Sequence, residues 1–482
     1  MIKAKPEEHI LVIQLAKLGD YLQTTPLLSA LKAENPTRRL TVLCALNQAE
    51  TASRTPAVDQ VIPLDLAGLS QMAKHGRLNP SEKISAVRDA CAPLTDMRFD
   101  RIINLNTSRI AALLSDMATA PRREGPTLAP DRRNLNLPRW ADFVMQVMTR
   151  RRLNRFNLVD LYLAYADSAP AEPRLVFSLE RADREAAQRL LGPSHDHRRI
   201  GLQLGSRHPD RQWPVTQFAA LSRKLLEDNQ TELVLLGTAN EAHMGAKLKE
   251  HLANNAAKPT RVRDLMGKTG LAELAGVLSG LDLLITTDTG TMHLASAVET
   301  PILALFMGPA LVHETGPYGP GHTVIQVNAP CSPCTEGNSR CPAKACRDLL
   351  EPALVADAAD GILKRRPSHV GLKNATGFNV RDSHIQVWTS TMDGFGVVYR
   401  PLSPWPLDRE TVQAMALRER GRRIIRPGYR TDRQDLAREL AAYTQPEEDI
   451  SLELKDLEKI ADPAVRGLIP QNPMPRLKAA AM

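Results

Sequence analysis

The chain has 482 residues, 43% of them hydrophobic and 24% charged, so it is long enough for two or three globular domains. A net charge of only +8 and an aromatic content of 4% argue against a nucleic-acid-binding protein. The sequence has no apolar run long enough to span a membrane and no signal peptide at its start, so we expect a cytoplasmic protein whose six cysteines are thiols.

The first part of the chain alternates between short apolar runs and a helical pattern, which is typical of an open parallel sheet. Strands are expected in HILVIQL, RLTVLCAL, VDQVIPLD and FDRIINLN, and a helix in LLSALKAENP. The segment from 110 to 165 is irregular and rich in arginine. We expect it to form long connections and helices on one side of the first sheet.

A second alternating set begins near residue 198. Its expected strands are RRIGLQLGS, TELVLLGT, DLLITTD and PILALFM, each followed or preceded by a helical pattern. The Pro/Ala-rich stretch SAPAEPR precedes this set, so we predict one domain over 1–190 and a second over 191–365. Residues 366–482 have a different character, and we predict an appended C-terminal domain of unknown role.

The segment LAKLGDYLQTTP follows the first strand and has two interpretations. Thr25 and Pro26 suit the start of a helix, where threonine caps and proline takes the first turn. Alternatively, Gly19 lets a ligand approach the backbone, and Asp20 faces a cleft, with Thr24 and Thr25 in the same loop. Ligands of open α/β sheets bind beyond the carboxyl ends of strands, where this loop lies.

The segment ITTDTGTMHLASA indicates an anion site. A buried strand ends at Asp288, and Thr289, Gly290 and Thr291 open a helix, where unpaired N–H groups and the helix dipole suit a diphosphate. His293 in the first turn would lie beside the bound anion. A simple capped helix is the alternative.

Arg211 lies in the loop GSRHPDRQWP, which leaves the first strand of the second set. A solvated surface charge is the usual state of an arginine. The functional interpretation is that its planar guanidinium donates two hydrogen bonds to phosphate oxygens.

Four of the six cysteines, Cys331, Cys334, Cys341 and Cys346, lie close together in the sequence. Their spacing is tighter than that of common zinc ribbons. A structural metal site is one interpretation, and reduced thiols or labile disulfides are the others.

Taken in order, several segments resemble glycosyltransferase family 9, the heptosyltransferases of lipopolysaccharide assembly. They are ILVIQLAKLGDYLQTTPLLSAL, FDRIINLNTSR, RQWPVTQFAAL, VLLGTANE, LMGKTGLAEL, TTDTGTMHLASAV and GPYGPGHTVI with the cysteines after it. The resemblance implies a GT-B fold, in which two Rossmann-like, doubly wound α/β domains face a cleft. It also implies inverting transfer of heptose from ADP-heptose to a sugar hydroxyl of a lipopolysaccharide core acceptor, with no metal required for the chemistry.

The resemblance also assigns roles to residues of this chain. The base aspartate falls on Asp20, the phosphate-binding group on Asp288, Thr289 and Gly290, and the cleft histidine on His293. Arg211 stands where the family usually has lysine, which keeps the charge but changes the donor geometry. An inverting enzyme needs its base and its leaving diphosphate on opposite faces of the sugar, so Asp20 belongs to the acceptor.

The expected partners are an ADP-sugar donor and a lipid-linked or Kdo-terminated acceptor, with no nucleic acid. Such an acceptor implies peripheral contact with the inner membrane, to which the arginine-rich segments around 122, 132 and 150–152 would contribute. Two other functions remain open. One is a protein-modifying heptosyltransferase, a branch with a four-cysteine metal knot, and the other is an inactive GT-B scaffold that binds a nucleotide sugar.

Overall fold

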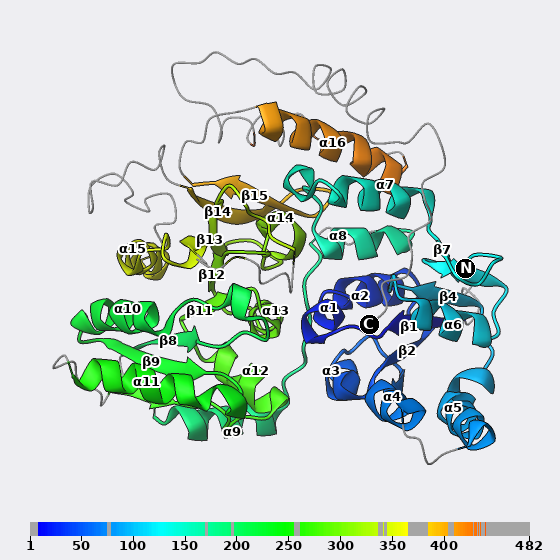
Figure 1. Ribbon diagram of the computed structural model, residues 1–482, viewed down its shortest axis with the longest axis horizontal. Coiled ribbons are helices and arrows are strands. Elements are labelled where there is room, and N and C mark those ends of the chain that lie inside the picture. Colours follow the sequence, from blue (N-terminus) through cyan, green and yellow to red (C-terminus); the bar gives the residue numbers. More distant parts are fainter. Residues whose placement is uncertain are drawn as a thin grey trace, which may run out of the picture.

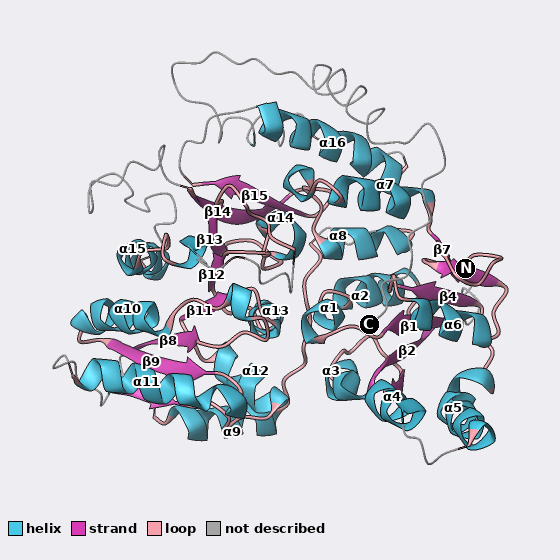
Figure 2. Ribbon diagram, viewed as in Figure 1, coloured by secondary structure: helices cyan, strands magenta, loops and turns pink. Residues whose placement is uncertain are grey.

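The protein consists of two α/β units that lie side by side, the first drawn in blue to cyan and the second mainly in green (Figure 1). A computed structural model describes residues 8–74, 79–168, 172–193, 197–254, 261–335, 341, 345–364, 384–402, 409–427, 429–430, 432, 434 and 439. In each unit helices cover both faces of a central sheet (Figure 2).

The first unit is built on a parallel sheet of five strands in the order β3-β2-β1-β4-β5. Its strands are β1 (His9–Gln14), β2 (Arg39–Ala45), β3 (Gln60–Leu64), β4 (Arg101–Asn104) and β5 (Arg122–Glu124), with a small hairpin of β6 (Thr127–Leu128) and β7 (Leu135–Asn136). Its helices are α1 (Leu18–Leu22), α2 (Thr25–Glu34), α3 (Ala49–Ser53), α4 (Leu66–Lys74), α5 (Pro80–Thr95), α6 (Arg109–Met117), α7 (Arg139–Met148) and α8 (Leu158–Tyr162).

The second unit is built on a sheet of eight strands in the order β10-β9-β8-β11-β12-β13-β14-β15. The strands are β8 (Arg198–Gln203), β9 (Thr231–Leu236), β10 (Val262–Asp264), β11 (Leu283–Thr287), β12 (Ile302–Phe306), β13 (Thr323–Val327), β14 (Ile385–Met392) and β15 (Val397–Pro401). The helices are α9 (Arg181–Leu191), α10 (Val215–Glu227), α11 (Ala242–Ala253), α12 (Leu271–Ser279), α13 (Gly290–Ala297), α14 (Val312–Thr315), α15 (Pro352–Leu363) and α16 (Arg409–Ile425).

Alternation of side chains along β1 explains how the first sheet is held between two layers of helices. Ile10 and Val12 pack on one face of the sheet, and Leu11 and Ile13 pack on the other, all of them fully buried. A central parallel strand is buried on both faces, so a continuous apolar run is the expected sequence for it. The strands and helices expected from the alternating patterns are confirmed in both units.

The boundary between the units differs from the expected position at residue 190. Helix α9 packs against α12 of the second unit so closely that a Cβ on Gly276 would lie 2.8 Å from the Asp183 carbonyl oxygen. Ala187 and Leu191 of α9 are buried in the core of the second unit. Hydrophobic contact therefore places α9 with the second unit, although it precedes the first strand of that unit in sequence.

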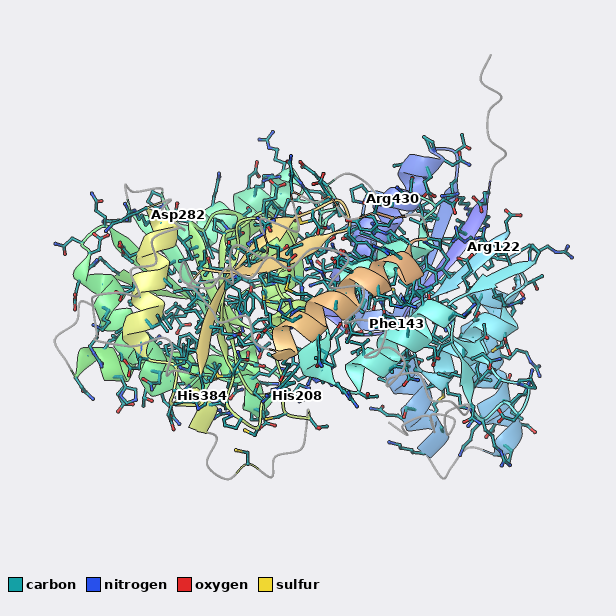
Figure 3. All side chains as sticks on the ribbon, turned by 90° about the horizontal axis from the view of Figure 1, so that it is seen from above. Arg122, Phe143, His208, Asp282, His384 and Arg430 are labelled. Carbon is teal, nitrogen blue, oxygen red and sulfur yellow. The ribbon has the colours of Figure 1, made fainter. Side chains whose placement is uncertain are left out.

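The C-terminal segment does not form a domain of its own over the part that the structure describes. Strands β14 and β15 extend the second sheet by antiparallel pairing to β13. Helix α16, in orange, then crosses the line where the two units meet (Figure 3) and packs on α7 of the first unit. Leu417 of α16 shares an apolar cluster with Phe143 and Phe156. The segment thus ties the second unit to the first.

A buried ion network reinforces this connection. Arg422 of α16, only 1% exposed, pairs with Asp393 between β14 and β15 at 2.5 Å and with Glu419 at 3.1 Å. Burial opposes ionisation of Asp393, but Arg422 and Arg418 hold its pKa below the usual value. The resulting stabilisation is therefore present at neutral pH and is lost as the pH falls through that lowered pKa.

Among the described residues, none of the helices combines the length and the apolar composition needed to cross a lipid bilayer.

We predict that Asp393→Ala lowers the free energy of unfolding by about 3 kcal/mol, because the substitution removes one partner of a buried arginine. Chemical denaturation measures this change. The control is Asp89→Ala on the exposed side of α5, which should change the stability by less than about 0.5 kcal/mol. An Asp393 variant as stable as the control would show that the network contributes nothing.

Candidate active site

A cavity of about 670 Å³, the cleft cavity, lies between the two units and is lined by both of them. The first unit contributes the start of α1, and the second contributes the loops that follow β8 and β11. Both sheets thus present the carboxyl ends of their central strands to the same space, as open α/β sheets do at ligand sites. The predicted residues that line it are Gly19, Asp20, Arg211, Asp288, Thr289, Gly290, Thr291 and His293.

Asp20 lies in the first turn of α1, which begins four residues after β1 ends at Gln14. The Lys17 N–H donates to Asp20 Oδ2 at 3.2 Å, so the carboxylate caps its own helix. The same side chain also lines the cavity. Burial raises the pKa of Asp20 above its usual value, and nearby His293 partly opposes this rise. The capping and the functional interpretations of Asp20 are therefore compatible.

Two glycines allow α1 of the first unit to pack directly against α13 of the second. A Cβ on Gly19 would lie 2.8 Å from His293 Cδ2, which is closer than side chains tolerate. On the opposite side of the contact, a Cβ on Gly290 would lie 3.1 Å from Leu18 Cδ2. Side chains at either position would push the two helices apart and move Asp20 away from α13.

The start of α13 has the features of an anion site. Thr289 is the N-cap, and its Oγ1 accepts a hydrogen bond from the Met292 N–H at 3.4 Å. Gly290 and Thr291 are the first two residues of the helix, and N–H groups at this position have no acceptor within the helix. Both residues line the cavity. These N–H groups, together with the helix dipole, favour a bound phosphate.

Asp288 precedes this helix and is held by two side chains. Arg211 Nη1 donates to Asp288 Oδ2 at 2.6 Å, and Thr315 Oγ1 donates to the same oxygen at 3.1 Å. Arg211 was expected to donate to phosphate oxygens, and in this structure its partner is the Asp288 carboxylate. The ion pair fixes the guanidinium at the edge of the cavity, beside the start of α13.

His293 is only 3% exposed and carries no charge at neutral pH. Burial lowers the pKa of His293 to about 4, with Arg211 adding to the effect and Asp20 opposing it. Its Nδ1 is buried and has no hydrogen-bond partner within the described residues. The imidazole is thus a neutral group that lies in the cavity wall beside both Asp20 and Arg211.

The sequence profile described as "Glycosyltransferase family 9 (heptosyltransferase)" matches residues 90–344, which is more than half of the chain. The chain belongs to glycosyltransferase family 9. This family 9 chain is similar to lipopolysaccharide heptosyltransferase 2 of Salmonella typhimurium, with 27% identity over 327 residues, 66% of this chain and 88% of that protein. Lipopolysaccharide heptosyltransferase 1 of Pseudomonas aeruginosa is 25% identical over 347 residues, with 68% and 86% covered.

Solved structures confirm the fold of this family 9 glycosyltransferase. The Escherichia coli ADP-heptose lipopolysaccharide heptosyltransferase II has a TM-score of 0.54 at 20% identity, with 74% of this chain and 99% of that chain covered. The family 9 glycosyl transferase of Veillonella parvula has a TM-score of 0.57 at 21% identity, with 74% and 97% covered. The expected GT-B architecture is thus confirmed.

Two residues expected in the cleft loop of the glycosyltransferase do not line the cavity. Thr24 Oγ1 donates to the Asp20 carbonyl at 3.0 Å and accepts from Gln14 Nε2. Thr25 Oγ1 donates to the Leu22 carbonyl at 2.7 Å and accepts from the Val176 N–H. Both are fully buried. Their hydroxyls connect α1, β1 and the linker, so their role is structural.

One further ion pair in the cavity wall was not predicted from the sequence. Arg151, just after α7, donates to the Glu314 carboxylate at 2.6 Å, and both residues line the cavity. Arg151 belonged to a run expected to meet the acceptor, whereas here it bonds to the other unit. Glu314 lies in no recognisable motif. Only the run of three arginines could have drawn attention to this pair.

The four clustered cysteines all lie among the described residues. The thiols of Cys334 and Cys346 have raised pKa values, first because they are buried and then because the other thiols are close. Across the described part of the chain, no group of three or more His, Cys, Asp or Glu side chains is arranged to hold a metal ion. The metal site stays a prediction from the sequence.

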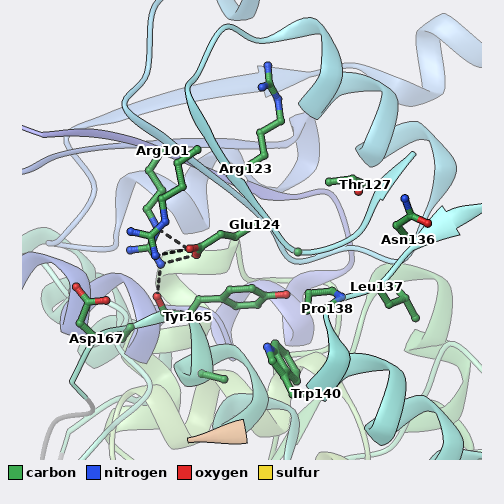
Figure 4. Close-up of a pocket in the computed structure, with 14 residues that line it drawn as sticks. Arg101, Arg123, Glu124, Thr127, Asn136, Leu137, Pro138, Trp140, Tyr165 and Asp167 are labelled. Atoms are coloured by element: carbon green, nitrogen blue, oxygen red, sulfur yellow. Dashed lines mark hydrogen bonds and ion pairs between the residues drawn. The ribbon is translucent and has the colours of Figure 1, made fainter. Parts of the chain in front are cut away.

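A second cavity, of about 420 Å³, lies in the first unit and shares no lining residue with the cleft cavity (Figure 4). Arg101 there donates to the Glu124 carboxylate and to the Tyr165 carbonyl, both at 2.5 Å. Trp140 meets Tyr165 edge to face at a centroid distance of 5.2 Å. Arg122 and Arg123 of the predicted membrane contact line it, but none of the predicted catalytic or nucleotide-sugar-binding residues does, so the cleft cavity is the candidate active site.

Elemental analysis of the purified protein tests the metal prediction. If the cysteines hold structural zinc or iron, the metal should be stoichiometric and its removal should lower Tm, because metal binding contributes directly to folding. Protein without metal, whose four thiols react with an alkylating reagent in the native state, would contradict the prediction.

Proposed function

We propose that the protein transfers heptose from ADP-heptose to a sugar hydroxyl of a lipopolysaccharide core acceptor, with inversion at the anomeric carbon. The observation that carries this proposal is the placement of Asp20 of the first unit and the start of α13 of the second in one cavity. The names of the family 9 relatives support heptose and lipopolysaccharide as the substrate classes.

In the proposed reaction, Asp20 accepts the proton of the acceptor hydroxyl while that oxygen attacks the anomeric carbon. The bond from this carbon to the diphosphate breaks on the opposite face, and ADP leaves with the electron pair. The N–H groups at the start of α13 and the Arg211 guanidinium stabilise the charge that develops on the diphosphate. A raised pKa suits Asp20 for this role, since a base works best when its pKa approaches the working pH.

His293 contributes to the proposed mechanism as a neutral group. A charged imidazole next to Asp20 would form an ion pair with it and weaken it as a base. Because burial keeps His293 uncharged, its ring can instead offer one N–H as a hydrogen-bond donor to the bound donor substrate.

The membrane contact proposed for a lipid-linked acceptor cannot use every arginine of the first unit. Arg123 donates to the backbone carbonyls of Ser115, Ala118 and Ala120, which makes it a structural residue. Arg122 and Arg132 have side chains 55% and 73% exposed. Each of them also pairs with a carboxylate, Arg122 with Glu124 and Arg132 with Asp116, so only exchange of these partners would let them bind an anionic surface.

Two alternatives are distinguished by simple measurements. A protein-modifying heptosyltransferase would transfer heptose to a polypeptide and not to a saccharide. An inactive scaffold would bind the nucleotide sugar at the start of α13 without turnover, but the raised pKa of Asp20 would have no use in such a scaffold.

We predict that the protein binds ADP more tightly than UDP or GDP, and that Arg211→Ala weakens ADP binding about 10- to 100-fold. The substitution removes a charge-assisted contact and leaves the Asp288 carboxylate beside the diphosphate with one cation fewer. Isothermal titration calorimetry measures the effect. Arg184→Ala, an exposed arginine of the same unit, is the control. Equal ADP affinity of the Arg211 variant and the parent would show that Arg211 has no part in binding.

We predict that Asp20→Asn lowers turnover about 10²- to 10⁴-fold, because asparagine keeps the shape but cannot accept the proton. ADP affinity should be nearly unchanged, since the diphosphate lies across the cavity. A transfer assay with ADP-heptose and a Kdo-terminated acceptor measures turnover. Glu82→Gln is the matched control, because Glu82 occupies the same capping position at the start of α5. Activity of the Asp20 variant close to that of the control would make Asp20 a helix cap only.

A further inference from the structure

A groove of about 810 Å³ lies beside the cleft cavity and is lined in part by the C-terminal segment. The groove and the cleft cavity share two lining residues, Met148 and Arg151, so they are adjacent spaces. One wall of the groove is the chain from Arg150 to Leu153, which follows α7. Glu410 and Gln413 at the start of α16, which lies next to this stretch, also line the groove. The groove therefore has the C-terminal segment as part of its lining.

The three consecutive arginines of the first wall have different environments. Arg151 pairs with Glu314 and donates to the Pro309 carbonyl at 2.7 Å. Arg152 donates to the backbone carbonyls of Ser332 at 2.8 Å and Pro330 at 2.9 Å. These two guanidinium groups fasten this wall to the second unit.

Arg150 differs from both neighbours. Its side chain is exposed, lines the groove, and forms no hydrogen bond or ion pair with any residue that the structure describes. The adjacent arginines hold the backbone on the C-terminal side of Arg150 in place. The side chain of Arg150 therefore starts from an anchored position at the groove, although its guanidinium is free to turn. A guanidinium that is anchored only through its backbone, and that has no partner among the described residues, is suited to bind an anionic ligand.

The part of the groove lining that α16 contributes is also held in place. Glu410 and Gln413 are three residues apart on α16, so they lie on the same side of the helix. The next turns of α16 are anchored to the first unit, where Ala414 and Leu417 are buried against Phe143 and Phe156. Both parts of the groove lining are thus packed against the rest of the protein.

We propose that this groove is an extension of the acceptor site, in which Arg150 binds an anionic group of the acceptor beyond the sugar that receives the heptose. The α16 wall then determines which acceptors fit, so that the C-terminal segment acts as a specificity-determining element. This inference rests on the proposed function. The anionic group is a carboxylate of the acceptor saccharide or a phosphate of its lipid anchor, and both offer oxygen acceptors to a guanidinium.

Three single substitutions test the charge of the groove, and the two exchanges on α16 leave its shape almost unchanged. Arg150→Ala removes the cation, Gln413→Glu adds an anion to the α16 wall, and Glu410→Gln removes one. Arg88→Ala is the matched control, because Arg88 is an exposed arginine on α5, outside the residues that line the groove. The KM for acceptor, kcat and ADP affinity are measured for each, with ADP-heptose and a Kdo-terminated lipid acceptor.

The expected result is a change confined to the KM for acceptor. Arg150→Ala should raise it about 5- to 30-fold through loss of a charge-assisted contact. Gln413→Glu should raise it about threefold and Glu410→Gln should lower it about twofold, and both effects should shrink at high salt. kcat should change by less than about twofold, and ADP affinity should be equal in all variants.

The source of the anion is identified by repeating the measurement with the same acceptor after removal of its phosphates. If the Arg150→Ala effect persists, Arg150 binds a carboxylate of the saccharide, and if it disappears, Arg150 binds a lipid phosphate. An acceptor KM that stays within twofold of the parent in all three variants, in an enzyme that transfers heptose normally, overturns the inference alone. A parent protein that transfers no heptose overturns the proposed function and the inference together.

Discussion

The direct contact of α1 with α13 is the constraint on which the candidate active site depends. The two helices come from different units, and they meet through a glycine on each side, Gly19 against His293 and Gly290 against Leu18. This contact brings the carboxylate of Asp20 and the unpaired N–H groups of α13 to one cavity. The proposed transfer needs both groups at one cavity, because in it the base and the leaving-group site flank the same sugar.

The charges around that contact are arranged so that each group keeps its own function. Arg211 is paired with Asp288 and lies near the phosphate end of the cavity. Burial raises the pKa of Asp20 and lowers that of His293, so that a carboxyl group with a raised pKa and a neutral imidazole lie side by side. If the site were open to water, histidine would hold a proton more readily and aspartate would be a weaker base. Burial of both side chains between the two units thus shifts the pKa values of Asp20 and His293 in opposite directions.

Several long-range interactions hold the two units in this orientation. Arg151 of the first unit reaches Glu314 and two carbonyls of the second. The C-terminal segment adds two strands to the second sheet and returns α16 to α7 of the first unit. An ion network centred on Arg422 connects the hairpin to this helix. The part of the chain with no recognisable motif therefore connects the two units and forms a wall of the groove next to the cleft.

The sequence alone determined the elements whose identity depends on nearby residues. The apolar run Ile10–Ile13 predicted a central strand, since both faces of such a strand are buried, and TTDTGT predicted a strand followed by a helix with an open N-terminus. The order of such segments predicted two Rossmann-like units. Asp20 and the start of α13 both line the cavity because they follow the carboxyl ends of central strands, a position that the fold class itself determines, while their roles stay predictions.

The tertiary structure alone decided which distant residues meet. Thr24 and Thr25 lie only four and five residues beyond Asp20, yet packing of α1 and α2 turns their hydroxyls into the protein. The partners Arg211–Asp288 and Arg151–Glu314 are 77 and 163 residues apart. The docking of α16 on α7 depends in the same way on how the two units are oriented. Local periodicity specifies which face of an element is buried, but not the element against which that face packs. The packing of distant elements on one another brought the charged residues to the cleft cavity and formed the groove beside it.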